Sequence, residues 1–121
     1  MKYEKLYEDF VSLFPEDKYE IQKIAETVSA DISDGMHIMF GMVVVPFLIE
    51  LLHANKECKL REAFAFFEKM ASEENTMISE VLEFTILEDI VSRGKDVLEK
   101  CKSYMGQRTL ESCLIVEKYL L

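Results

Sequence analysis

Few residues in this 121-residue chain could support acid–base chemistry, because its only histidines are His37 and His53. Asp34 lies three residues before His37, a spacing at which one helical turn would bring the carboxylate to the imidazole. Catalysis by such a pair needs a further group within hydrogen-bond reach, and the sequence identifies neither that group nor a substrate pocket. We interpret Asp34 and His37 as a capping contact and expect a protein that is not an enzyme.

Three glutamates, Glu80, Glu83 and Glu88, have the spacing of carboxylate ligands along one helix. A di-metal site of the helix-bundle type also needs Glu-x-x-His motifs on two neighbouring helices, so the ligand count here is too small. Neither an H-E-x-x-H motif nor an EF-hand loop is present. We therefore expect no metal and no cofactor, and we interpret Glu80 and Glu83 as part of a solvated helix face.

Glu88 is unusual because regular helical spacing places it beside Phe84 and Val91 on an otherwise apolar face. A buried carboxylate is costly without partners. We expect Glu88 to accept hydrogen bonds from a neighbouring helix terminus or loop. The phenylalanines and methionines recur at helical spacing and are interpreted as core, with a few exposed ones available for an interface.

The cysteines, Cys58, Cys101 and Cys113, are odd in number and include no C-x-x-C pair. This pattern suits neither a disulfide framework nor a thiolate zinc site, and it is typical of a reducing compartment. The N-terminal segment is charged and amphipathic and lacks the apolar stretch of a secretory signal. We expect a cytoplasmic protein.

Apolar residues recur at intervals of three and four along most of the chain, which predicts helices. The expected helices cover approximately 3–13, 17–31, 36–52, 58–71 and 76–91. Two more helices follow, and we expect Gly106 to be the C-cap of the first of these two. After the first helix, the rest pair as hairpins over about 17–52, 58–91 and 95–120. We predict an all-α fold of about seven helices, stacked as antiparallel hairpins in a HEAT- or armadillo-like single domain, residues 1–121.

The segment Met36 to Leu52 is almost wholly apolar, with Pro46 near its middle. Proline lacks a backbone donor and crowds the carbonyl of Met42, so we predict a kinked, buried helix. The alternative is a buried strand over Met42 to Ile49, because three consecutive valines favour β structure. The segment is marginal in length for a bilayer and is interrupted by polar residues, so we expect no membrane span.

The net charge indicates the kind of partner. The chain has 14 basic and 23 acidic residues, which gives a formal net charge of −9. Such a surface repels nucleic acid and attracts a basic protein, such as a nuclease whose substrate groove is positive. In the expected hairpin layout, acidic residues gather at the turns within hairpins and basic residues at the connections between them. The candidate partner-binding residues are Asp31, Asp34, Glu73, Glu74, Glu80, Glu83 and Tyr104.

Several stretches in a consistent order carry a resemblance to a known family. They are Phe40-Gly41 through Pro46-Phe47 and Leu51-Leu52; Phe67-Glu68-Lys69-Met70-Ala71; Glu80-Val81-Leu82-Glu83 through Thr85 to Leu87-Glu88; and Tyr104-Met105-Gly106 with Thr109. The sequence resembles a family of small bacterial helical proteins known as a domain of unknown function, some of whose members are immunity proteins of contact-dependent growth inhibition (CDI).

This resemblance implies an antidote that neutralises a cognate toxin domain, a class that includes EndoU-like and other ribonucleases. The candidate partner-binding residues would then be toxin-binding residues. For the shared Glu68, Glu80 and Glu88, the alternative interpretation is scaffold rather than interface. We expect steric occlusion of the toxin's active groove, with acidic side chains pairing with the cations that hold RNA phosphate. The alternative is a helical protein-interaction module with an unrelated regulatory role, which binds through a concave face.

Overall fold

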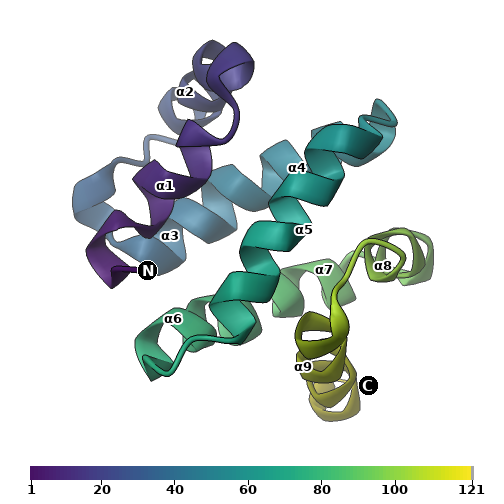
Figure 1. The fold of residues 1–121 in the computed structure, drawn as a ribbon. Helices are drawn as coiled ribbons and strands as arrows, with labels where there is room; N and C mark the ends of the chain where they lie inside the picture. Colours follow the sequence, from purple (N-terminus) through teal and green to yellow (C-terminus); the bar gives the residue numbers. More distant parts are fainter. Residues whose placement is uncertain (121) are drawn as a thin grey trace. The chain divides into compact units, whose positions relative to one another are not determined.

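The structure is a computed structural model that describes residues 1–120, and it contains only helices and their connections in that range (Figure 1). This confirms the predicted all-α fold. Contacts group the chain into two compact units, the first being Met1–Ala63 and the second beginning at Phe64. The boundary falls within α5 (Glu57–Ala71). The stacking of hairpins into a single HEAT-like domain stays a prediction.

The first unit is built from two short helices and one long one, each of the short ones preceded by a 3-10 turn. These elements are α1 (Leu6–Ser12), α2 (Lys18–Thr27) and a long helix made of α3 (Met36–Met39), a π turn (Phe40–Val44) and α4 (Val45–His53). Phenylalanine rings join them: the ring centroids of Phe10 and Phe40 are 6.0 Å apart, and those of Phe14 and Phe47 are 5.3 Å apart. Such pairs add to the hydrophobic gain of burial.

The strand considered for Met42 to Ile49 is wrong, because the π turn and α4 cover that stretch. The irregularity predicted around Pro46 is present as the π turn Phe40–Val44, which ends two residues before the proline. Pro46 lies in the first turn of α4, immediately after the π turn. A π turn inserts one additional residue between bonded groups, which makes room where the proline ring would crowd the preceding carbonyl. The helix therefore continues past the proline.

Within residues 1–120, one helix is long and apolar enough to cross a bilayer by length and composition: Met36–His53, with a mean hydropathy of 1.8. However, 56% of this window is buried. Val43, Val44, Val45 and Leu48 are fully buried. The helix thus serves as the centre of this unit's core, which accounts for its apolar sequence.

The second unit is built around another long helix, made of α6 (Thr76–Val81), a π turn (Leu82–Leu87) and α7 (Glu88–Ser92). Ile78, Leu82, Ile86 and Ile90 have no exposed surface, so this helix is central to its unit. Shorter helices pack against it: α8 (Lys95–Lys102) contacts α7, and α9 (Gln107–Leu120) contacts both α7 and the π turn.

The N-terminus of α9 is held by Glu68 of α5. The Glu68 carboxylate accepts hydrogen bonds from the backbone N–H groups of Arg108 at 3.0 Å and Thr109 at 2.9 Å, and from the Thr109 hydroxyl at 2.7 Å. Unpaired N–H groups and the helix dipole both favour an anion at this position. Burial acts to raise the pKa of Glu68, but these hydrogen bonds together lower it below its ordinary value.

Gly106 was predicted to be a helix C-cap, and the structure assigns it a different role. Its φ is not positive, unlike the φ of Gly35 and Gly94. A Cβ atom at Gly106 would lie 2.6 Å from the carboxylate carbon of Glu68, which is shorter than any ordinary contact. Glycine is therefore required so that the Glu68 side chain can approach α9.

Candidate functional site

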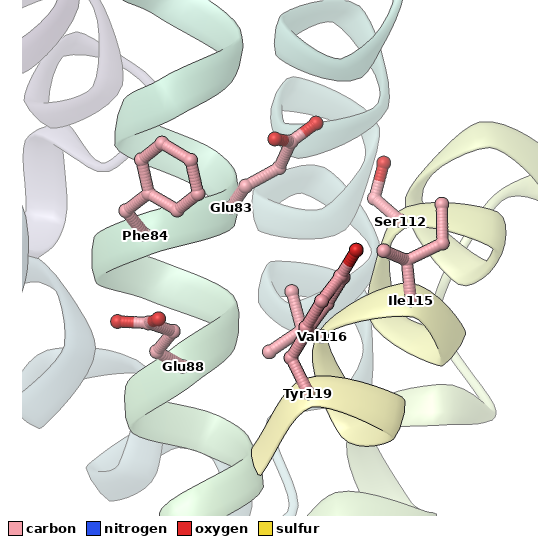
Figure 2. Close-up of a pocket in the computed structure, with 7 residues that line it drawn as sticks. All are labelled: Glu83, Phe84, Glu88, Ser112, Ile115, Val116 and Tyr119. Atoms are coloured by element: carbon pink, nitrogen blue, oxygen red, sulfur yellow. The ribbon is translucent and has the colours of Figure 1, made fainter.

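A surface groove of about 460 Å³ lies on the second unit, between the long central helix and α9 (Figure 2). Figure 2 shows Glu83 and Phe84 on one turn of the central helix and Glu88 on the next, with the remaining side chains coming from α9. The lining residues are Glu83, Phe84, Glu88, Ser112, Ile115, Val116 and Tyr119. The groove is largely apolar, and its charged groups are both carboxylates.

The π turn explains why Glu83 and Glu88 line the same groove. In a regular α-helix, a separation of five residues rotates a side chain by about 140° beyond a full turn. The π turn Leu82–Leu87 contains an additional residue, which takes up much of that rotation. Glu88 therefore lies on the helix face that carries Glu83 and Phe84. The sequence carries no glycine or proline within this turn that would have revealed the shift in phase.

Glu83 and Glu88 are half-buried, and neither makes a hydrogen bond or ion pair with any residue in 1–120. Other half-buried carboxylates of the chain are engaged. Asp17 contacts the Lys59 ammonium at 2.7 Å, Asp89 the Arg93 guanidinium at 2.6 Å, and Glu117 the Lys102 ammonium at 2.6 Å. The oxygens of these two carboxylates are open to solvent, since no buried side-chain oxygen in residues 1–120 lacks a partner, and they are therefore accessible to donors of another molecule.

The hydrogen bonds expected for Glu88 are instead made by Glu68, as described for α9. The prediction for Glu88 was therefore wrong, because within residues 1–120 no helix terminus or loop donates a hydrogen bond to it. Glu68 was interpreted as scaffold, and its hydrogen bonds with the N-terminus of α9 are a structural role of that kind. Glu88 instead lies at the groove beside Glu83, which was among the candidate binding residues.

Large apolar side chains of the groove are open to solvent. Phe84 is 56% exposed, Ile115 58% and Tyr119 84%. Phe84 thus departs from its interpretation as core, because it lies at the groove and not on the face of the fully buried Ile86 and Ile90. Contiguous exposed apolar groups beside polar ones are typical of interaction sites. An aromatic face beside carboxylates also suits a cation on an apolar stem.

Asp31 and Asp34 lie in the first unit and form a capping box around the 3-10 turn Ile32–Asp34. Asp31 accepts hydrogen bonds from the backbone N–H and hydroxyl of Ser33, and Asp34 accepts one from the backbone N–H of Asp31 at 2.9 Å. The side-chain hydrogen bond from Ser33, and then the backbone one, lowers the pKa of Asp31. Both carboxylates are exposed and hold this turn together, and the contact of Asp34 is with Asp31, whereas the expected capping contact with His37 stays a prediction.

The other candidate binding residues lie in the second unit. Glu74 and Glu80 are exposed, and Glu73 is half-buried and has an interaction partner. Tyr104 is half-buried and its ring is stacked on Phe64, with centroids 6.0 Å apart and an interplanar angle of 20°. Glu83 is the candidate that lines the groove. The assignment of all seven to a toxin interface stays a prediction.

No group of three histidine, cysteine or acidic side chains in residues 1–120 is arranged to hold a metal ion. Burial raises the pKa of the Cys101 thiol to about 12 and that of the Cys113 thiol to about 11, which keeps both protonated. Cys58 is exposed. The groove itself offers carboxylate acceptors, one serine hydroxyl, one phenol and apolar surface, which is chemistry for recognition.

The fold and the groove define an acidic, all-helical protein with an apolar surface groove that carries two unpaired carboxylates. The chain belongs to DUF7674, a domain of unknown function whose family model matches residues 7–120. That match spans both units and confirms the resemblance to a domain of unknown function. No curated protein and no solved structure matches the chain.

Proposed function

We propose that this protein binds a basic protein partner and neutralises it as an antidote binds a toxin domain. The observation that carries the proposal is the groove of the second unit, where Glu83 and Glu88 are half-buried beside the exposed ring of Phe84 and have no partner among residues 1–120. Desolvated hydrogen-bonded charge pairs and buried aromatic groups dominate the affinity of many protein complexes. Both kinds of group are available here on one surface.

The net charge supports the same kind of partner. A formal charge of −9 on 121 residues steers a basic protein toward the surface and speeds encounter. Cations that could oppose this are partly neutralised within the protein, since Lys59, Arg93 and Lys102 each contact a carboxylate. We expect the association rate to fall steeply as salt is added, whereas contacts in the groove govern dissociation.

The particular partner we propose is a ribonuclease toxin domain of a CDI system, EndoU-like toxins being one such class. The support for this step is the sequence resemblance to a family with immunity proteins among its members. A ribonuclease holds RNA phosphate with lysines and arginines, and these are the side chains that the groove carboxylates would engage. Neutralisation would follow from steric occlusion of the toxin's active groove.

Affinity purification tests the proposal. The tagged protein would be expressed in the organism that encodes it, and bound proteins would be identified by mass spectrometry, with products of neighbouring genes included as candidates. Each candidate would then be expressed in a test strain with and without this protein. We expect a basic nuclease domain that is toxic alone, and growth that is restored by co-expression.

A matched pair of variants connects neutralisation to the surface. Glu83→Gln with Glu88→Gln removes two charges from the groove, and Glu4→Gln with Glu26→Gln removes two exposed charges outside it that are not among the candidate binding residues. We expect the groove pair to lose protection and the control pair to retain it. Recovery of a regulatory adaptor with no toxic candidate would contradict the antidote role and favour the interaction module.

A further inference from the structure

The groove of the second unit differs in charge from hollows of the first unit. Three hollows of the first unit each include a lysine, namely Lys18, Lys23 or Lys59. The groove between the central helix and α9 contains Glu83 and Glu88 and no basic residue. Its charge is therefore uncompensated from within, and it complements a cation supplied by another molecule.

The lining also indicates the shape of that cation. Phe84, Ile115 and Val116 provide an apolar wall for an aliphatic stem, and the aromatic rings of Phe84 and Tyr119 provide faces for a planar cation. A guanidinium group stacks on such a face and can donate several hydrogen bonds in one plane. Carboxylates accept these bonds, frequently in pairs.

We propose that the groove receives an arginine side chain from an apolar segment of the partner protein, as the anchor of the complex. This proposal deepens the proposed function and rests on it for the identity of the partner as a basic protein. The guanidinium donates hydrogen bonds to Glu83 and Glu88, and its stem and flanking residues cover Phe84 and Ile115. Because the carboxylates are already half-buried, docking costs less desolvation than pairing with fully solvated anions would.

A short peptide tests the groove without the natural partner. The probe is the blocked tripeptide acetyl-Leu-Arg-Leu-amide, and the control is the same peptide with citrulline, which keeps the shape of arginine and lacks its charge. Each would be titrated into the ¹⁵N-labelled full chain and followed by NMR. We expect the arginine peptide to shift the amide signals of Phe84, Glu88 and Ile115, with affinity at least about tenfold above that of the citrulline peptide.

Variants assign the binding to the two carboxylates. We expect Glu83→Gln with Glu88→Gln to weaken arginine-peptide binding by about tenfold or more, to the level of the citrulline peptide. The control pair Glu4→Gln with Glu26→Gln removes the same charge from exposed positions and leaves the affinity within about twofold. Glutamine is close in size to glutamate, and circular dichroism of both pairs would verify that the fold is retained.

Three results would overturn the proposal: equal binding of both peptides, signal shifts confined to residues outside the groove, or equal loss in both variant pairs. A dimer in sedimentation that Phe84→Ala dissociates would also overturn it, since the groove would then be occupied by a second copy. Failure of the proposed function is a separate outcome. In that case the arginine peptide binds as expected, but affinity purification yields no toxic partner.

Discussion

One carboxylate oxygen of Glu68 accepts hydrogen bonds from both the backbone N–H and the hydroxyl of Thr109, at 2.9 Å and 2.7 Å. The residues lie 41 positions apart, so this contact fixes the start of α9 to α5 within the second unit. Because α9 supplies Ser112, Ile115, Val116 and Tyr119 to the groove, its placement determines the shape of the candidate site.

Removing the Glu68 cap is expected to destabilise the protein. Glu68→Ala leaves the N–H groups of Arg108 and Thr109 without their acceptor. A hydrogen bond to a charged group contributes about 1.5–3 kcal/mol to the stability of a protein. We expect the free energy of unfolding to fall by about 2 kcal/mol in urea denaturation. The control Glu74→Ala, at an exposed glutamate of the same unit, is expected to change it by less than about 0.5 kcal/mol.

Gly106 and Glu68 are expected to be energetically coupled. A Cβ atom at Gly106 would displace the Glu68 side chain from α9, so Gly106→Ala alone loses much of the cap. Once Glu68 is already alanine, the same substitution meets little obstruction. A double-mutant cycle on the free energy of unfolding is expected to give a coupling of about 1 kcal/mol or more. Additive effects would mean that close approach to Glu68 is not what requires glycine at this position.

The contribution of Glu68 depends on pH with a defined sign. Folding lowers the pKa of this carboxyl from its ordinary value of 4.5, so the ionised form stabilises the native state. The stabilisation is complete above pH 4.5 and is lost as the pH falls through the folded-state value. We expect the stability difference between the wild type and Glu68→Gln to be constant from pH 6 to pH 7 and to shrink below pH 4.5. A difference that grows on acidification would contradict the assignment.

The all-α fold could be predicted from the sequence because the spacing of apolar residues is close to helical over most of the chain. Pro46 marked the place where one long helix would be irregular. The π turn at Leu82–Leu87 could not be predicted in the same way, since nothing in its residue types differs from a regular buried helix. Regular helical spacing placed Glu88 beside Phe84, as the groove has them, but it did not reveal that Phe84 is exposed and that Glu83 lies at the same groove.

The cap on α9 was missed for a related reason. Glu68 and Thr109 are distant in sequence, and neither residue type reveals a contact that only tertiary structure creates. Gly106 was visible as a glycine at a helix boundary, where a C-cap is the common explanation. The groove combines residues from two helices, so the local pattern identified Glu83 but left its neighbours from α9 unconnected to it.

Truncation of Phe64 is expected to destabilise the fold far more than truncation of Phe84. Phe64 is 1% exposed and stacks on Tyr104, so Phe64→Ala is expected to lower the free energy of unfolding by about 3–5 kcal/mol. Phe84 is 56% exposed, so Phe84→Ala is expected to lower it by less than about 1 kcal/mol. Binding of the arginine peptide is expected to weaken in the Phe84 variant. Unchanged peptide affinity in that variant would remove the aromatic ring from the recognition surface.

The thiols are expected to differ sharply in reactivity. Cys58 is exposed, whereas Cys101 and Cys113 are fully buried, and burial raises their pKa values to about 12 and about 11. The thiolate is the reactive form, and it is scarce in both buried cysteines at neutral pH. Titration with a chromogenic disulfide at pH 7.5 is expected to label one thiol quickly and the others at least about a hundredfold more slowly. Cys58→Ser is expected to abolish the fast phase, and denaturation of the wild type to expose all three thiols.

Fast labelling that persists in Cys58→Ser would show that the packing of α8 and α9 opens readily. The groove lined by α9 would then lack the rigid wall that its recognition chemistry requires.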